Sequence, residues 1–353
     1  MLAKLILEDG SVYEGEVYGA GRSVAGEVVF NTGMVGYPEC FTDPSYTGQI
    51  LVLTYPLIGN YGVPAYNGRD DLLNTAFESD RIHIAGLVVS EVSFHYSHRK
   101  DHSNLNNWLK ANGVPAISGI DTRALTQKLR SKGAMLGKIV VENDKDVDFF
   151  DPNQENLVAR VSPSEPVTYG DGEKTVLLVN CGCKYNIIRS LVRRNVKVVS
   201  VPWDWDFTGQ SFAGLLVSNG PGDPRMCDVT VGRIRRVLER EIPTFGICLG
   251  NQLLALAAGA STYKLKFGHR SQNQPCVQVG SKRCFITSQN HGYAVDERSL
   301  PDDWEPWFFN ANDGTNEGIR HKRKPFMGVQ FHPEASPGPL DTAFLFDEFV
   351  SML

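Results

Sequence analysis

Beyond residue 174, short apolar runs alternate with stretches whose apolar residues recur every three or four positions. Short continuous apolar runs are typical of parallel strands buried on both faces, and the longer spacing is typical of helices. The predicted strands are 175–179, 196–201, 214–218 and 243–248, and the predicted helices are 187–192, 229–238 and 249–258. This alternation indicates an α/β domain with a largely parallel sheet and helices on both faces. Shorter strands at 284–287 and 326–331 and a helix at 342–352 are predicted to close the domain.

The first 150 residues show no such alternation. Two apolar runs, 5–7 and 12–17, flank a polar turn and predict a β-hairpin. Further predicted strands are 28–30, 50–54 and 84–89, and predicted helices are 105–111 and 122–131. This half is therefore predicted to be a mixed α+β domain, and it carries no catalytic signature of its own.

Residues 151–174 contain three prolines, two glycines and several acidic residues, a composition typical of a linker. A chain of 353 residues also predicts two domains, at roughly 100–200 residues each. The predicted organisation is thus a domain at 1–150, a linker at 151–174 and an α/β domain at 175–353.

Charge and composition exclude several classes of protein. The 35 Lys and Arg residues are outnumbered by 40 Asp and Glu residues, and a net charge of −5 disfavours a nucleic-acid binder. The longest apolar run, 253–258, is far shorter than the roughly 20 residues of a membrane span, and the N-terminus lacks a signal-peptide core. Seven cysteines without a CxxC pair argue against a disulfide framework or a zinc site. We expect a cytoplasmic protein with reduced thiols, no membrane contact and no bound metal.

The strongest chemical signal is the segment GICLG at 246–250, where a predicted strand runs directly into a predicted helix. It has the form of a nucleophile elbow, G-x-S-x-G, with Cys248 in place of serine. The glycines allow strand and helix to pack around a strained turn, and the start of the helix favours a thiolate. An ordinary buried cysteine is the alternative interpretation.

A thiolate nucleophile needs a base, and the base needs a group that orients it. The segment GVQFHPE places His332 and Glu334 two residues apart, so along extended backbone both side chains point the same way. A structural histidine is the alternative, but a strand leading into His-Pro-Glu downstream of the elbow favours a catalytic pair. Six of the remaining histidines are weaker candidates, because they lie in the first domain or, for His269 and His321, beside basic residues; His291 belongs to the SQNHGY motif described below.

A third candidate is the loop SNGPGDP at 218–224, which follows a predicted parallel strand. Ligands bind at this edge of open α/β sheets. The amides of Gly220 or Gly222, together with that of Leu249, are placed to stabilise an oxyanion, although a plain tight turn is the alternative. Two other motifs are interpreted as structural: 170–175 lacks the Gly-Lys-Thr order of a phosphate loop, and Cys181 and Cys183 are too close for a zinc knuckle.

These motifs, in this order, resemble the class I (triad) glutamine amidotransferases. The resemblance extends over essentially the whole chain to the small subunit of carbamoyl-phosphate synthetase. It is carried in the first half by GEVVF at 26–30, NTG at 31–33, TDPSY at 42–46, LTYPLIGNYG at 53–62 and DTR at 121–123, and in the second half by SQNHGY at 288–293 and HPEASPGP at 332–339.

The resemblance implies a glutaminase that feeds carbamoyl-phosphate synthesis for arginine and pyrimidines. Cys248 would form a glutamyl thioester, His332 would transfer protons and Glu334 would orient His332. L-Glutamine would be bound by Ser45, Gly220, Gly222, Leu249, Gln252, Asn290, Gly292 and Tyr293. Ser45 would reach the pocket from the first domain. No cofactor is implied on this chain; ATP and Mg²⁺ would bind a large ATP-grasp subunit, which we expect to be a separate chain.

Asn251 and Tyr293 stand where many members have histidine and phenylalanine, which affects expected affinity and leaves the expected reaction intact. Two alternatives stay open at this point. The chain could serve another synthetase, although those relatives lack the first domain. It could also be a silent scaffold that only stimulates a partner, if Cys248 is merely buried. One branch of the family has lost the cysteine and uses free ammonia, and the presence of Cys248 favours retained glutaminase chemistry.

Overall fold

The computed structural model describes residues 1–66, 69–70, 73–98 and 101–353. The chain divides into two compact units, Met1–Glu155 and Asn156–Leu353. Each is described by itself below. Among the described residues, no helix combines the length and apolar character needed to cross a membrane.

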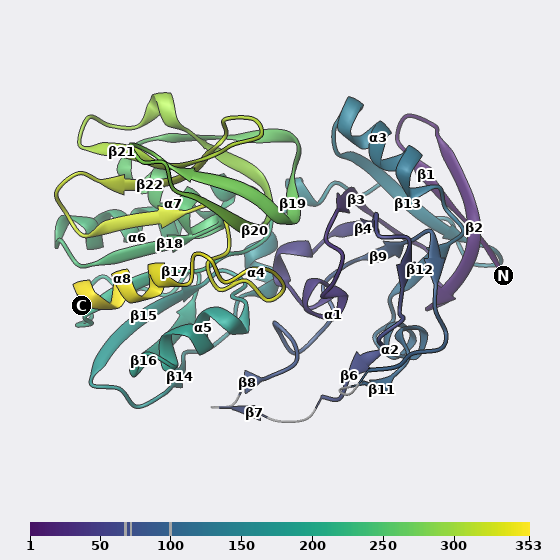
Figure 1. The fold of residues 1–353 in the computed structure, drawn as a ribbon, viewed down its shortest axis with the longest axis horizontal. Coiled ribbons are helices and arrows are strands. Elements are labelled where there is room, and N and C mark those ends of the chain that lie inside the picture. Colours follow the sequence, from purple (N-terminus) through teal and green to yellow (C-terminus); the bar gives the residue numbers. More distant parts are fainter. Residues whose placement is uncertain (67–68, 71–72, 99–100) are drawn as a thin grey trace. The chain divides into compact units, whose positions relative to one another are not determined.

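The first unit is built around a closed barrel whose strands follow the order β1-β13-β3-β4-β9-β12-β2 (Figure 1). These strands are β1 (Leu2–Leu7), β2 (Val12–Gly19), β3 (Val24–Asn31), β4 (Gln49–Leu53), β9 (Gly86–Val88), β12 (Pro115–Ser118) and β13 (Met135–Val141). The predicted hairpin is confirmed, since β1 and β2 pair antiparallel. Neighbours from β3 through β4 and β9 to β12 run parallel, which the sequence pattern did not indicate.

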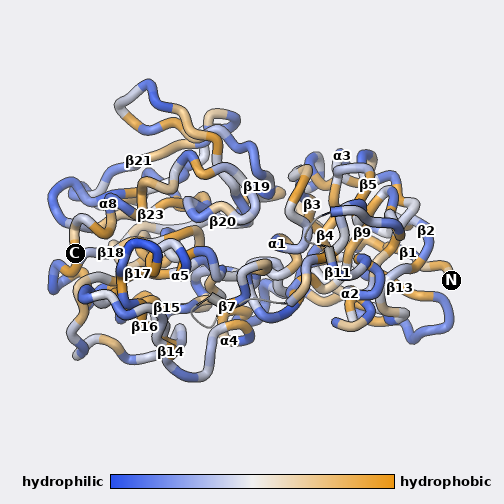
Figure 2. The backbone as a smooth tube through the Cα atoms, turned by 60° about the horizontal axis from the view of Figure 1, so that its bottom comes forward, coloured by the Kyte–Doolittle hydropathy of each residue, from blue (hydrophilic) through white to orange (hydrophobic). Residues whose placement is uncertain are grey.

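Every second side chain along the barrel strands points inward, and these side chains fill the interior of the barrel. In β1, Ala3, Leu5 and Leu7 are buried while the residues between them are more exposed. Hydrophobic stretches run along β3, β4 and β9 in Figure 2. The helices of this unit are α1 (Tyr37–Phe41), α2 (Leu105–Ala111) and α3 (Thr122–Lys132), with 3₁₀ turns η1 (Pro44–Tyr46) and η2 (Pro152–Gln154). Short strands complete it: β5 (Leu57–Ile58), β6 (Val63–Pro64), β7 (Arg69–Asp70), β8 (Leu73–Asn74), β10 (Glu91–Val92) and β11 (Asp101–Ser103).

The two predicted helices of the first unit form because each has a cap and an apolar face. Asn104 accepts a hydrogen bond from the Asn107 amide at the start of α2, at 2.8 Å. Asp121 accepts one from the Ala124 amide at the start of α3, at 2.9 Å. Buried leucines then fasten both helices to the unit. Helix α2 has the predicted bounds, and α3 extends one residue beyond them.

The second unit contains a ten-stranded sheet in the order β14-β16-β15-β17-β18-β23-β22-β21-β19-β20. The central strands β15 (Lys174–Asn180), β16 (Val196–Pro202), β17 (Gly214–Val217), β18 (Thr244–Ile247) and β23 (Phe326–Val329) pair in parallel. The remaining strands, β14 (Val167–Tyr169), β19 (Ser261–Gln278), β20 (Cys284–Asp296), β21 (Trp304–Asn310) and β22 (Asn316–His321), pair antiparallel. The expectation of a largely parallel α/β sheet is confirmed for its central part.

Helices cover both faces of this sheet. In Figure 1, α5 (Tyr185–Val192) and α8 (Phe344–Met352) lie in front of it, and α6 (Asp228–Glu239) and α7 (Leu249–Ala258) lie behind it. Leu177 of β15 belongs to the core that includes Ile234 of α6 and Leu253 of α7. Phe245 of β18 packs on the opposite side, 5.6 Å from the ring of Phe349 in α8. The central strands are therefore buried on both faces, which explains their continuous apolar runs.

Residues from Asn156 onward, within the predicted linker at 151–174, belong to the second compact unit. Residues 157–161 form helix α4 (Leu157–Val161), in which Leu157 and Val158 are buried. Residues 167–169 form β14, which adds an antiparallel edge strand to the second unit. The prolines of residues 151–174 are compatible with an edge strand and with loops around a short helix. The composition of this segment therefore did not distinguish such elements from a free linker.

Candidate active site

Cys248 directly follows strand β18 and lies in a sharp turn at the start of helix α7. Cys248 has φ 56° and ψ −106°, a left-handed φ that a side-chain-bearing residue rarely adopts. Its amide donates to the carbonyl of Val329 on β23 at 2.8 Å, and its side chain is buried. This backbone geometry is that of the predicted nucleophile elbow.

The two flanking glycines are required by space. A Cβ on Gly246 would lie 2.4 Å from the Gly250 carbonyl oxygen, and a Cβ on Gly250 would lie 2.0 Å from the Val217 carbonyl oxygen. Both contacts are with backbone, which cannot rotate away. Glycine at these positions thus permits the close approach of α7 to β17 and β18.

We expect Gly250→Ala to destabilise the protein by about 2–3 kcal/mol through overpacking. Gly232→Ala is the matched control, because Gly232 also lies inside a helix but a Cβ added to it would meet no atom within 4 Å. That change should be neutral or stabilising by about 0.5–1 kcal/mol. Denaturant unfolding of both variants measures the difference; equal stabilities would contradict the steric explanation.

His332 and Glu334 form the predicted pair. The His332 amide donates to the Ser288 carbonyl at 2.9 Å, which anchors the segment after β23 beside β20. The imidazole Nδ1 lies 2.7 Å from Glu334 Oε1, and both side chains are buried. Nδ1 therefore carries the proton of this bond, since the carboxylate accepts.

Electrostatics around the pair favour an imidazolium. Burial alone would lower the pKa of His332, but the charges of Glu334 and Cys248 and their hydrogen bonds raise it to about 10. Cys248 is thus an electrostatic neighbour of the imidazole. The Cys248 thiol also lies 3.7 Å from the Asn290 carbonyl oxygen. The arrangement brings a nucleophile, a proton-transfer group and an orienting carboxylate together, as acyl transfer requires.

A fourth charged residue, Lys184, completes this site. Its Nζ lies 3.0 Å from Glu334 Oε1 and also donates to the Ala335 carbonyl, and its side chain is only 3% exposed. Burial alone would raise the pKa of Glu334, but the charges of Lys184 and His332 lower it to about 2. Glu334 is consequently held as a carboxylate.

The loop after β17 lies against the start of α7. A Cβ on Gly220 would come within 2.2 Å of the Cys181 carbonyl oxygen and 2.7 Å of Leu249 Cδ2. Gly222 has φ +86°, a conformation that favours glycine. The predicted donors of an oxyanion hole, Gly220 and Leu249, are therefore neighbours.

Five predicted glutamine contacts lie on α7 and β20: Leu249, Gln252, Asn290, Gly292 and Tyr293. Gln252 Nε2 donates to the Tyr293 carbonyl at 2.9 Å, and Asn290 lies beside Cys248. Gly292 lies between them on β20. The structure brings these residues together with Cys248 in the second unit.

Ser45 belongs to the first unit, where it lies in η1. Asp43 accepts a hydrogen bond from the Ser45 amide at 2.9 Å, and Ser45 is buried. The predicted role of Ser45 in binding glutamine stays a prediction.

Sequence reasoning did not identify Lys184. The sequence feature that could have indicated it is a lone lysine between a buried strand and a helix, in the segment NCGCKYN at 180–186. At that sheet edge a buried lysine requires an anionic partner. The identity of the partner depends on a contact across 150 residues of sequence, which no local pattern contains.

Comparison with known proteins matches both units to family models. Residues 5–139 match the model described as carbamoyl-phosphate synthase small chain, CPSase domain. Residues 177–352 match the model described as glutamine amidotransferase class-I.

Three curated relatives cover nearly the whole chain. The multifunctional protein CAD of Squalus acanthias is 52% identical over 99% of this chain. The multifunctional protein ura1 of Schizosaccharomyces pombe is 50% identical over 100% of it. A human protein named carbamoyl-phosphate synthase (ammonia), mitochondrial, is 50% identical over 99% of it.

The chain spans only 16%, 17% and 24% of the lengths of these three relatives, respectively. In each of them the matching stretch is one part of a much longer polypeptide. The expectation that a synthetase partner is a separate chain stays a prediction.

Proposed function

This chain belongs to the carbamoyl-phosphate synthase small-chain family and carries a class-I glutamine amidotransferase domain, and on that premise we propose that it hydrolyses L-glutamine to supply ammonia for carbamoyl-phosphate synthesis. The observation that carries the proposal is Cys248 at a left-handed turn, beside the buried pair of His332 and Glu334. A cysteine held at an elbow next to an imidazolium is suited to attack a carboxamide.

The proposed reaction proceeds in two halves. The Cys248 thiolate attacks the side-chain carboxamide of glutamine, and the amides of Gly220 and Leu249 stabilise the oxyanion. His332 gives its proton to the departing nitrogen, so the C–N bond breaks, ammonia leaves and a glutamyl thioester forms. His332, now neutral, takes a proton from water, and the hydroxide cleaves the thioester to glutamate and the Cys248 thiolate.

The other residues of the site hold these groups and the substrate. Glu334 keeps His332 in the tautomer with a proton on Nδ1, and Lys184 keeps Glu334 ionised. The proposed glutamine contacts are Ser45, Gly220, Gly222, Leu249, Gln252, Asn290, Gly292 and Tyr293.

We further propose that the ammonia is consumed by a large synthetase portion that binds ATP and Mg²⁺ and makes carbamoyl phosphate from bicarbonate. This portion lies on a partner subunit or further along the same polypeptide. The small-chain family match and the length of the curated relatives support such a portion. We also propose that the protein is located in the cytoplasm.

The proposal is tested by assaying glutamate and ammonia release from L-glutamine, with and without the synthetase portion. We expect hydrolysis that rises when the synthetase and ATP are present, and labelling of Cys248 by an electrophilic glutamine analogue. Absence of hydrolysis and of labelling in the complete assembly would overturn the proposal and favour a silent scaffold.

We expect Glu334→Gln to move the alkaline limb of the glutaminase pH profile to lower pH. The carboxylate raises the pKa of His332, so the imidazolium of the unsubstituted protein persists to about pH 10. Without that charge, His332 deprotonates at lower pH and the acid for the departing nitrogen is lost earlier. Initial rates between pH 6 and pH 10.5 measure the shift. Asp303→Asn, which removes the carboxylate beside the distant His321, should leave the profile unchanged.

A further inference from the structure

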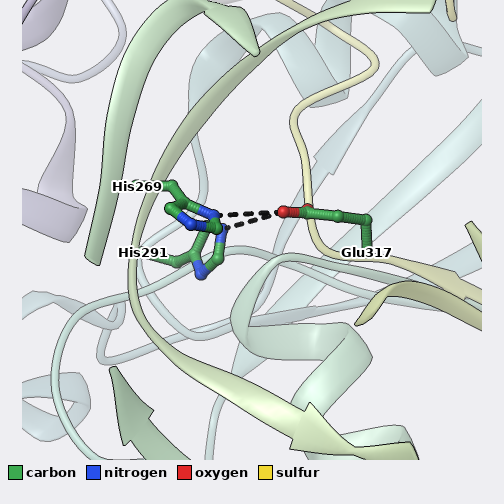
Figure 3. A group of neighbouring side chains, drawn as sticks. All are labelled: His269, His291 and Glu317. Carbon is green, nitrogen blue, oxygen red and sulfur yellow. Dashed lines mark hydrogen bonds and ion pairs between the residues drawn. The ribbon is translucent and has the colours of Figure 1, made fainter. Parts of the chain in front are cut away.

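A second buried group of ionisable residues lies within the same unit. His269 on β19, His291 on β20 and Glu317 on β22 converge from three strands, as Figure 3 shows. Their relative exposures are 8%, 4% and 0%. The reaction proposed above uses none of them, although buried ionisable groups are costly unless they are paired.

His269 bridges two carboxylates. Its Nδ1 lies 3.1 Å from Glu317 Oε1, and its Nε2 lies 2.8 Å from Asp313 Oδ2. Because both partners accept, His269 donates from both nitrogens and is an imidazolium. Burial opposes this state, but the bonds and charges of Asp313 and Glu317 raise the pKa of His269 to about 9. Asn310 donates a further bond to Glu317 Oε1 at 3.2 Å.

This ion pair packs directly against His291. The rings of His269 and His291 meet edge to face, with centroids 4.9 Å apart, and Glu317 Oε1 lies 3.8 Å from His291 Nε2. Burial and the positive charge of His269 lower the pKa of His291, so this ring is neutral. Its Nδ1 donates to the Tyr293 carbonyl oxygen at 2.8 Å, and its Nε2 lies 3.2 Å from Gln289 Oε1.

Two routes connect this group to the predicted glutamine contacts. The Tyr293 carbonyl that accepts from His291 also accepts from Gln252 Nε2 at 2.9 Å. Gln252 Nε2 additionally donates to the side-chain oxygen Oε1 of Gln330 at 3.0 Å. The backbone N–H of Gln330 in turn donates to the backbone carbonyl of Glu317 at 2.9 Å. The orientation of the Gln252 amide and of residues 290–293 thus depends on where β22 and His291 are held.

We propose that His269 and Glu317 are positioning residues for glutamine binding, which act through His291 on the Tyr293 carbonyl and the Gln252 amide. The inference rests on the proposed glutaminase function and deepens it. Loss of the pair would remove the ring and the carboxylate that pack against His291 and would loosen β20 where substrate binds, while Cys248, His332 and Glu334 would keep their own contacts. The effect should therefore fall on KM more than on kcat.

A divalent cation is the competing occupant of this group. One ligand atom from each of the three residues lies within 4.8 Å of the others. Binding an ion would require His269 to release a proton that it donates directly to Glu317. The existing bonds satisfy His269 at both nitrogens, which favours the hydrogen-bonded arrangement.

The test compares His269→Ala with His269→Asn in the assembly that hydrolyses glutamine. Alanine removes both bonds, and we expect the KM for glutamine to rise by about tenfold or more with kcat within about threefold. Asparagine places an N–H near the position of Nδ1, so the bond to Glu317 and the ordinary KM should be retained. His321→Ala is the matched control. His321 is also a buried histidine of β22, and it pairs with a different carboxylate, Asp303. This substitution should leave KM unchanged.

Three outcomes would overturn the inference. An unchanged KM in a folded His269→Ala variant would show that the pair does not position the substrate site. If that variant does not fold, Asp313→Ala replaces it, since Asp313 is exposed and its loss weakens the same pair; an unchanged KM there would likewise contradict the proposal. Stoichiometric divalent metal, found by elemental analysis of the unsubstituted protein and lost in His269→Asn, would assign the group to a cation.

The failure of this inference is distinguishable from that of the proposed function. If the unsubstituted assembly turns over no glutamine, the proposed function fails first. If it turns over glutamine and the KM for glutamine is unchanged by substitution of His269, only the positioning role fails.

Discussion

Replacing Cys248 with alanine is expected to lower glutamine hydrolysis by a factor of about 10⁴ or more. The sulphur is the only protein atom in the proposed reaction that forms a covalent bond to the substrate, and alanine offers no substitute. The small side chain fits the elbow without a new contact, so the left-handed backbone at this position should survive. Rates of glutamate release, compared at saturating glutamine, measure the loss.

Two controls separate lost chemistry from lost structure. Cys284→Ala removes an exposed cysteine outside the site and should leave the rate unchanged. Supplying ammonia to the Cys248→Ala assembly should restore carbamoyl-phosphate synthesis if a synthetase portion is present. Substantial glutamine hydrolysis by Cys248→Ala would remove the nucleophile from the proposed reaction.

Replacing Lys184 with methionine is expected to destabilise the protein by about 3–5 kcal/mol. The substitution preserves much of the buried volume but removes Lys184, one of the two cationic groups, with His332, that contact the buried Glu334 carboxylate. Glutaminase activity should also fall, because the pKa of Glu334 rises when the Lys184 charge is removed, and a protonated Glu334 no longer stabilises the imidazolium.

A double-mutant cycle tests the electrostatic explanation. Lys184→Met combined with Glu334→Gln removes both charges, so the double variant should be more stable than Lys184→Met alone. Stability is measured by denaturant unfolding of all four proteins. A double variant that is less stable than both single variants would mean that packing, and not the unpaired charge, causes the loss.

Local sequence predicted a large part of the second unit and its nucleophile. The elbow at Cys248 is marked in the sequence by neighbouring residues: an apolar strand, two glycines that permit backbone contact, and an apolar helix. The pair of His332 and Glu334 is likewise separated by one residue, so its geometry follows from the backbone between them. For these features, pattern and spacing contain the necessary information.

Other features could not be predicted because their causes are distant in sequence. The long strands β19 and β20 contain many polar residues, including Arg270 and Gln289, which are buried by pairing between strands and not by an apolar pattern. The barrel of the first unit closes through β1 and β13, whose pairing joins residues at least 130 positions apart. Short strands of this kind indicate a β structure but do not indicate which edges meet.

The sequence by itself determined the nucleophile, the orienting pair and the α/β character of the second unit, because each is marked by a pattern within short stretches of consecutive residues. Only the tertiary structure decided that Lys184 lies beside Glu334 and that His269 and Glu317 pack against His291. A buried charge is stable only beside a counter-charge, and which counter-charge it meets is set by the order and register of strands that the folded sheet brings together.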